Sequence, residues 1–204
     1  ETQLARALIA AESAGIAVRV LLNKCDLPHA ALARERLQPY RAMGVAVIET
    51  ALKTRPAEAR ALLAPLLAGR TTLVLGPSGT GKSTLINLMV DNAAAQVGEV
   101  SQALNSGRHT TTTTTWYWLD SQRHEALIDS PGFQEFGLRQ IDAQQLPLLM
   151  PDLSAHVASC RFYNCSHRQE PGCGVAAAVE RGDVSPSRWR IYGEICDELA
   201  RTKW

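Results

Sequence analysis

The first half of the chain alternates amphipathic helical patterns with short apolar runs. Each helical pattern ends at a glycine, the residue type that most easily takes the left-handed conformation closing a helix. In chain order the pattern predicts a helix at about 2–14, a strand at 16–22, a helix at about 29–43, a strand at 45–50, a helix at about 56–68 and a strand at 71–76. This alternation indicates an α/β fold with a mostly parallel sheet and helices on both faces.

The second half of the chain follows a different pattern. It predicts a helix at about 82–92, a polar stretch at 96–109, strands at 113–119 and 125–130, a weak helix before Pro151, and short helices at about 174–181 and 187–202. We therefore place a domain boundary near residue 150, with an α/β domain over residues 1–150 and a small, mainly helical domain over residues 151–204.

Composition excludes several classes of protein. The 204 residues are 46% hydrophobic and 20% charged, as in ordinary globular proteins, and the net charge of +1 gives no overall basic surface for nucleic acid. No apolar run approaches the roughly 20 residues of a membrane-spanning helix, and the start of the chain lacks the pattern of a secretory signal. We therefore expect no membrane contact. Three of the five cysteines lie between residues 160 and 173, which suits a metal site in a reducing cytosol better than a disulfide framework, so we expect a cytoplasmic protein.

The clearest motif is G-P-S-G-T-G-K-S-T at residues 76–84. It fits G-x-x-x-x-G-K-[ST] and lies between a predicted strand and a predicted helix, the context that a phosphate-binding P-loop requires. The backbone N–H groups of such a loop converge on phosphates, Lys82 reaches the β- and γ-phosphates as a catalytic cation, and Ser83 binds Mg²⁺. The predicted nucleotide-binding residues here are Gly76, Pro77, Ser78, Gly79, Thr80, Gly81, Lys82, Ser83 and Thr84.

A second motif, N-K-C-D at residues 23–26, directly follows the strand at 16–22. The Asp26 carboxylate can accept hydrogen bonds from the N1–H and N2–H₂ groups of guanine, a donor pair that adenine lacks. We expect Asn23 to fix the loop and contact the purine, and the Lys24 stem to lie over the base. Alone the motif is weak, because these residue types are common after strands. The alternative is a P-loop ATPase or kinase with an accidental N-K-C-D.

The segment D-S-P-G, which begins at Asp129, ends the second strand after the P-loop. It fits D-x-x-G, in which Asp129 holds Mg²⁺ through water and the N–H of Gly132 meets the γ-phosphate, although the same residues also make an ordinary β-turn. Between the two motifs, the threonine-rich stretch at 107–116 occupies the place of the first switch loop of a GTPase. We expect Thr111 to bind Mg²⁺ there, with Thr110 as the alternative.

These motifs occur in an unusual order. Ordinary small GTPases run P-loop, switch I, D-x-x-G and then N-K-x-D, whereas here N-K-x-D comes first. The segment E-T-A-L-K at 49–53 precedes the P-loop and occupies the place of the base-contacting S-A-K loop, which makes Thr50 and Ala51 candidate nucleotide contacts. The chain therefore resembles the circularly permuted GTPases.

A cluster of cysteine and histidine follows the proposed boundary. The spacing C-x4-C-x-H-x5-C supplies three thiolates and one imidazole, which suits a closed, tetrahedral and structural Zn²⁺ site. The alternative is free buried cysteines beside a surface histidine. The predicted zinc ligands are Cys160, Cys165, His167 and Cys173.

All these motifs in this order, with G-R-H-T-T-T and D-S-P-G-F, resemble the RsgA family (also called EngC or YjeQ) over nearly the whole chain. The resemblance implies a GTPase that hydrolyses GTP to GDP and phosphate, is activated by the small (30S) ribosomal subunit with its 16S rRNA, and assists late maturation of that subunit. It also implies an N-terminal OB-fold domain outside this chain. We expect a monomer whose chain begins inside the GTPase domain of a longer protein, after a central strand.

The residue that positions the attacking water is the open point of this interpretation. Many GTPases use a glutamine directly after D-x-x-G, but Phe133 stands there and cannot hydrogen-bond water. His109 is the predicted replacement, with an RNA-contacting or solvated loop residue as the alternative. Arg188 and Arg190 are candidate phosphate contacts in the second domain. The alternative function is a GTP-gated module that binds rRNA or the ribosome, with incidental hydrolysis.

Overall fold

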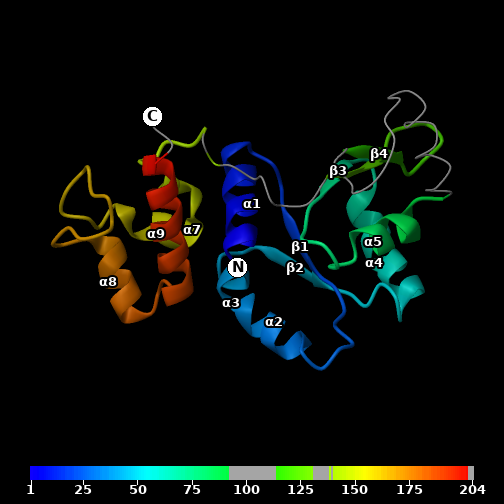
Figure 1. Cartoon of the computed structure of the whole chain (residues 1–204), viewed down its shortest axis with the longest axis horizontal. Coiled ribbons are helices and arrows are strands. Elements are labelled where there is room, and N and C mark those ends of the chain that lie inside the picture. The colour runs from blue at the N-terminus through cyan, green and yellow to red at the C-terminus, as the bar shows by residue number, and fades with distance from the viewer. Residues whose placement is uncertain (92–113, 131–137, 139, 202–204) are drawn as a thin grey trace. The chain divides into compact units, whose positions relative to one another are not determined.

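A computed structural model describes residues 1–91, 114–130, 138 and 140–201 of the chain (Figure 1). The chain divides into two compact units, each built from segments that are distant in sequence. Unit 1 comprises Glu1–Val20, Arg34–Val47 and Phe136–Trp204, and unit 2 comprises Leu21–Ala33 and Ile48–Glu135. The domain boundary expected near residue 150 stays a prediction.

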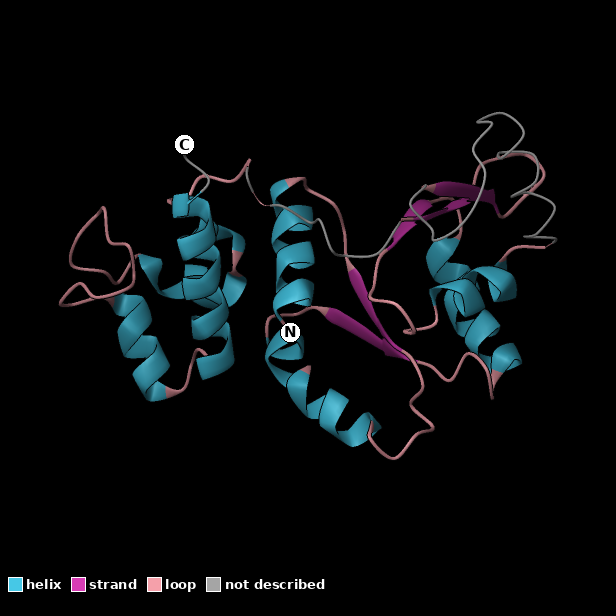
Figure 2. Ribbon diagram, viewed as in Figure 1, coloured by secondary structure: helices cyan, strands magenta, loops and turns pink. Residues whose placement is uncertain are grey.

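The strands form two sheets (Figure 2). Strand β1 (Arg19–Leu22) pairs with β2 (Ala46–Glu49) in a two-stranded sheet. A three-stranded sheet has the order β3-β5-β4, from β3 (Thr71–Val74), β5 (Ala126–Asp129) and β4 (Thr115–Trp118). Strands β3 and β5 run parallel and β4 runs antiparallel to β5, so the sheet is mixed, and the predicted α/β class with parallel pairing is confirmed.

The core of unit 2 lies where two helices pack against strand side chains. Helix α4 (Pro56–Leu67) contacts α5 (Lys82–Met89), and their buried residues join one apolar cluster with Leu52, Tyr117 and Leu127. Alternation along β4 directs Tyr117 into this cluster, whereas Trp116 and Trp118 face away and contact each other with ring centroids 5.4 Å apart. The core thereby fixes both the end of β3 and the start of α5, between which the P-loop lies.

The core of unit 1 is largely helical. Its elements include α1 (Thr2–Ser13), α3 (Gln38–Ala42), the short 3₁₀ helix η2 (Leu146–Leu149), α7 (Pro151–Val157), α8 (Gly174–Arg181) and α9 (Pro186–Arg201). The fully buried side chains of Ile9, Leu153 and Ile195 belong to one apolar cluster. A bidentate ion pair between Arg6 and Glu198, with an Nη2–Oε1 distance of 2.6 Å, ties α1 to α9.

Two helices differ from the sequence-based expectation. The helix predicted at 29–43 is two helices, α2 (Ala30–Arg36) and α3, because Pro39 has no N–H to continue the hydrogen-bond ladder and its ring would clash with the preceding turn. Helix α7 was not expected, although Pro151 at its first position is a typical helix start. The strands are also shorter than predicted; β1, for example, begins at Arg19 rather than at residue 16.

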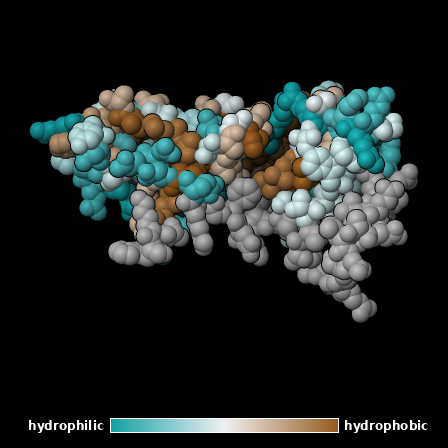
Figure 3. Space-filling model, turned by 90° about the horizontal axis from the view of Figure 1, so that it is seen from above, coloured by the Kyte–Doolittle hydropathy of each residue, from teal (hydrophilic) through white to brown (hydrophobic). Residues whose placement is uncertain are grey.

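Apolar side chains also reach the surface, and Figure 3 shows brown apolar patches broken up by polar side chains on one face. The exposed apolar residues include Ile16 and Leu148 in unit 1 and Leu73 in unit 2. Within the described ranges, no helix is both long and apolar enough to cross a membrane.

Candidate nucleotide site and metal centre

The predicted P-loop connects the end of β3 to the start of α5 in unit 2. Gly79 and Gly81 have φ angles of 78° and 109°, in the left-handed region that favours glycine. A Cβ on Gly81 would lie 2.3 Å from Nδ2 of Asn23, so a side chain at this position would displace the Asn23 amide. The strand–loop–helix context and the glycine positions are those that a phosphate-binding loop requires.

Polar contacts within the loop hold its lysine. Nζ of Lys82 donates to the carbonyl oxygens of Gly76 at 2.7 Å and Pro77 at 3.2 Å. The hydroxyl of Thr80 also donates to the Pro77 carbonyl, at 2.8 Å. Ser83 and Thr84 are exposed in the first turn of α5. The ammonium group therefore already lies in the loop, on carbonyl partners that phosphate oxygens can replace.

The N-K-C-D segment lies against this loop. The Asn23 side-chain amide donates to the Thr80 carbonyl at 2.9 Å, and Nζ of Lys24 donates to the Gly79 carbonyl at 2.8 Å. These partners are 57 and 55 positions apart in the sequence. The fold therefore brings the predicted base-reading and phosphate-binding motifs together in unit 2.

The loop after β2 completes this arrangement. Its Thr50 N–H donates to the Leu22 carbonyl at 2.9 Å, and its carbonyl accepts the Cys25 N–H at 3.0 Å. Thr50 and Ala51 are buried, with 6% and 8% exposure, and the Thr50 hydroxyl has no hydrogen-bond partner among the described residues. Both candidate residues therefore lie in the loop that fixes the start of N-K-C-D.

Two further residues of this loop were missed by the sequence analysis. The N–H of Leu52 donates to Oδ1 of Asn23 at 3.1 Å, and the hydroxyl of Thr54 donates to Oδ2 of Asp26 at 3.0 Å. A backbone donor has no sequence signal. Thr54 lies one position beyond E-T-A-L-K, and its contact is visible only once the two loops are placed together.

Asp129 is the last residue of β5, opposite Val74 of β3 and Thr115 of β4. It is 9% exposed, and its Oδ1 has no hydrogen-bond partner among the described residues. Burial raises the pKa of this carboxyl, while the positive charge of Lys82 lowers it. A buried, unpartnered carboxylate oxygen close to the P-loop lysine fits a hydrated Mg²⁺ ion. The predicted site residues His109, Thr111 and Gly132 lie outside the described residues.

The predicted zinc ligands converge in unit 1. The ligand atoms of Cys160, Cys165, His167 and Cys173 all lie within 4.8 Å of one another. Nδ1 of His167 is 3.3 Å from Sγ of Cys160 and 3.6 Å from Sγ of Cys173, and these two sulfurs are 4.0 Å apart. In a tetrahedron with Zn–S bonds of about 2.3 Å, neighbouring ligand atoms are about 3.8 Å apart. The four residues thus form a candidate structural zinc site.

The surroundings of this cluster suit a bound cation. The N–H groups of Gly174 and Ala176 donate to the sulfurs of Cys160 and Cys173, each at 3.3 Å, as donors to thiolates do. Burial lowers the pKa of His167, which favours the neutral, metal-binding imidazole. Burial also raises the pKa of the Cys165 thiol to about 12, so thiolate formation here depends on a cation.

A carboxylate holds the ligand-bearing loop between Cys165 and Cys173. Glu170 accepts hydrogen bonds from the N–H of Ser166 at 2.7 Å and from the N–H groups of Arg168 and Gln169 at 3.2 Å. The bonding with Ser166 is the largest cause that lowers the pKa of Glu170 to about 2. The positive φ of His167, 57°, is supported by this turn.

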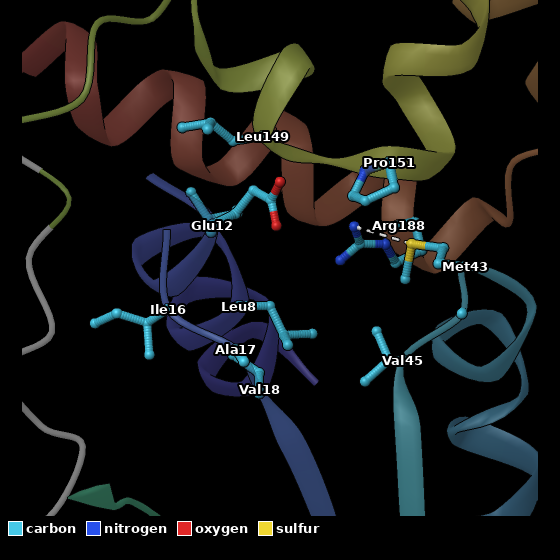
Figure 4. Close-up of a pocket in the computed structure, with 12 residues that line it drawn as sticks. Leu8, Glu12, Ile16, Ala17, Val18, Met43, Val45, Leu149, Pro151 and Arg188 are labelled. Carbon is cyan, nitrogen blue, oxygen red and sulfur yellow. Dashed lines mark hydrogen bonds between the residues drawn. The ribbon is translucent and has the colours of Figure 1, made fainter. Parts of the chain in front are cut away.

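Arg188 is not available as a phosphate contact. It is 2% exposed, and its Nε and Nη2 donate to the Asp152 carboxylate at 2.7 and 2.9 Å. Figure 4 shows it beside Met43 and Pro151 at a pocket of about 240 Å³ within unit 1. The expectation for Arg188 was wrong because sequence alone does not show that Asp152 neutralises this guanidinium. Arg190 is exposed and pairs with Glu194, and it stays a candidate phosphate contact.

Comparisons with known proteins agree with this geometry. Residues 1–139 match the sequence profile of the RsgA GTPase family. Proteins named small ribosomal subunit biogenesis GTPase RsgA are similar over nearly the whole chain. The one from Variovorax paradoxus (strain S110) is 55% identical over 100% of this chain and 66% of its own length. The one from Burkholderia mallei (strain SAVP1) is 50% identical over 98% of this chain and 64% of its own length.

Two solved structures share the fold. The crystal structure of YloQ, a circularly permuted GTPase, has a TM-score of 0.74 and 26% identity over 100% of this chain and 64% of its own. YjeQ from Thermotoga maritima has a TM-score of 0.73 and 27% identity over 98% of this chain and 66% of its own. The chain thus spans slightly less than two thirds of the length of these relatives. With this fold and its family match, the chain belongs to the RsgA GTPase family.

Proposed function

We propose that this protein binds GTP with Mg²⁺, hydrolyses it to GDP and phosphate, and assists late maturation of the small (30S) ribosomal subunit, which activates it. Family membership supports the reaction, and the names of the relatives supply the biological process. Contact with 16S rRNA, a monomeric state and a cytoplasmic location are part of the same proposal.

The observation that carries the proposal is the convergence of three loops in unit 2. Asn23 donates to the P-loop carbonyl of Thr80 at 2.9 Å and accepts from Leu52 at 3.1 Å, so one side chain joins all three. A base-reading carboxylate and a phosphate-binding loop held in fixed register suit a guanine nucleotide. A P-loop with an accidental N-K-C-D would have no reason to form these contacts.

The residues have separate roles in the proposed reaction. The P-loop N–H groups and Lys82 bind the phosphates and stabilise the charge that develops during phosphoryl transfer. Asp26 pairs with the guanine edge, and Asn23 and Lys24 hold its loop against the P-loop. Mg²⁺ bound with the nucleotide supplies further charge neutralisation, and Ser83 and Asp129 are the described residues that would hold it.

Three proposed roles fall on residues outside the described part of the chain. We assign Thr111 to Mg²⁺, the N–H of Gly132 to the γ-phosphate and His109 to the orientation of the attacking water. In many GTPases the residue directly after D-x-x-G orients the water, but here that residue is Phe133. A neutral imidazole at His109 can accept a proton or a hydrogen bond near neutral pH.

Single-turnover hydrolysis of GTP, measured with and without purified 30S subunits, tests the function. We expect slow hydrolysis by the protein alone and a large increase with 30S subunits, because switch loops generally need ordering by a partner. Equal rates in both conditions, with GTP-dependent binding to the subunits, would instead indicate a GTP-gated binding module. The His109→Ala variant should lose most of the stimulated rate while its GTP affinity stays unchanged.

A further inference from the structure

The loop between β2 and α4 contacts the base-reading aspartate directly. The hydroxyl of Thr54 donates to Oδ2 of Asp26 at 3.0 Å. Thr54 is itself held by a turn, because its N–H donates to the Ala51 carbonyl at 3.1 Å and the next N–H, of Arg55, donates to the same oxygen at 2.8 Å. Helix α4 begins at the following residue, Pro56, so a rigid element anchors the turn.

The same loop reaches both ends of N-K-C-D, but by different means. It contacts Asn23 through the backbone N–H of Leu52, at 3.1 Å, which any residue except proline would supply. It contacts Asp26 through the side chain of Thr54. The first contact is therefore independent of side-chain type, whereas the second depends on a hydroxyl at position 54.

The orientation of the Asp26 carboxylate determines how well it can pair with guanine. Both oxygens must lie in the plane of the base to accept N1–H and N2–H₂ together, and Asp26 is exposed, so solvent alone does not fix its rotamer. One hydrogen bond to Oδ2 selects an orientation and leaves Oδ1 and the second lone pair of Oδ2 for the base. Fixing the group before the ligand arrives reduces the entropic cost of binding.

We propose that Thr54 is a positioning residue that orients Asp26 and thereby strengthens recognition of the guanine base. This inference rests on the proposed function, in which Asp26 reads guanine. It adds a specificity-determining side chain outside the N-K-x-D and E-T-A-L-K segments.

The test compares GDP and ADP affinities of the full chain by isothermal titration with Mg²⁺. Thr54→Val removes the hydroxyl at nearly unchanged shape; GDP affinity should fall about three- to tenfold, the range of one net hydrogen bond, with ADP affinity unchanged. Thr54→Ser should restore GDP affinity. The matched control is Thr2→Val, which removes another exposed hydrogen bond from a threonine hydroxyl to a carboxylate, that of Glu194 at 3.2 Å in unit 1. This control should leave the GDP and ADP affinities unchanged.

A double-mutant cycle with Asp26→Asn separates the possible results. In the Asp26→Asn background, Thr54→Val should cause no further loss of GDP affinity, because the carboxylate it orients is gone. An equal loss for GDP and ADP, or wild-type GDP affinity in Thr54→Val, would overturn the role of Thr54. A GDP preference that survives Asp26→Asn would instead overturn the proposed guanine reading itself.

Discussion

The nucleotide site and the Cys/His cluster are built in opposite ways. Residues from loops 28 to 57 positions apart form the nucleotide site, and exposed hydrogen bonds such as Lys24 to Gly79 hold it. The cluster takes all its ligands from residues 160–173, with His167 at 3% and Cys173 at 5% exposure. One site depends on the whole sheet-and-helix framework of its unit, and the other depends on a single short segment.

This difference predicts that the two sites respond differently to substitutions. Exposed polar contacts are weak individually, so the nucleotide site can exchange them for contacts with a ligand, as when phosphates replace the carbonyl partners of Lys82. The cluster has no such substitutes, because its four side chains, two of them buried, together satisfy one ion. Changes in the nucleotide site should therefore be graded, whereas loss of a zinc ligand should be close to all-or-none.

The largest expected effect is loss of zinc from Cys173→Ser. Removing one of four ligands should reduce the zinc content, measured by atomic emission, from about one ion per chain to near zero. The effect should exceed the roughly 10–100-fold loss of affinity that follows removal of an outer hydrogen bond. Cys25→Ser is the matched control, because Cys25 lies outside the cluster, where its thiol donates to the Leu22 carbonyl at 3.1 Å. Full zinc content in Cys173→Ser would contradict the assignment.

The next largest expected effect is a loss of stability when the buried ion pair between Arg188 and Asp152 is broken. Arg188→Met leaves the Asp152 carboxylate buried without its partner, which should lower the free energy of unfolding by about 3–5 kcal/mol in urea denaturation. The double variant Arg188→Met, Asp152→Leu should recover most of that loss. GDP affinity of the folded fraction should not change, since the pair lies in unit 1; a parallel loss would show that the two regions are not separable.

Gly81 tests the tolerance of the nucleotide site. Gly81→Ala places a Cβ 2.3 Å from Nδ2 of Asn23, and should lower GDP affinity at least tenfold by displacing that amide. The left-handed backbone alone costs about 1–2 kcal/mol of stability for a residue with a Cβ. Gly69→Ala controls for that cost, because Gly69 has a φ of 66° and no atom within 4 Å of its added Cβ. Equal GDP affinities for both variants would contradict the close packing of the loops.

A smaller effect than the loss of a zinc ligand concerns the turn that carries His167. Glu170→Gln removes the charge that accepts N–H bonds from Ser166, Arg168 and Gln169, and should lower zinc affinity about tenfold in a chelator competition. Glu180→Gln in α8 is the control, as an exposed glutamate outside this turn. Unchanged zinc affinity in Glu170→Gln would mean that the ligands alone hold the loop.

The sequence predicted local features well and long-range features poorly. The order of helices and strands followed from periodicity, and the zinc ligands followed from spacing, because both depend on neighbouring residues. Pro39 was a visible sign that the helix predicted at 29–43 is interrupted, but the helical pattern on both sides of it favoured one continuous helix. The contact between Thr54 and Asp26 and the burial of Arg188 against Asp152 join residues 28 and 36 positions apart, so only the folded chain reveals them.

The most direct test of the account is the nucleotide preference of the full chain. Competition between GDP and ADP for a fluorescent guanine nucleotide, in wild type and Asp26→Asn, measures whether the convergent loops form one guanine site. We predict a strong GDP preference in wild type that Asp26→Asn largely removes, since adenine cannot supply the donor pair. Equal affinities for GDP and ADP in the wild-type protein would contradict the central claim.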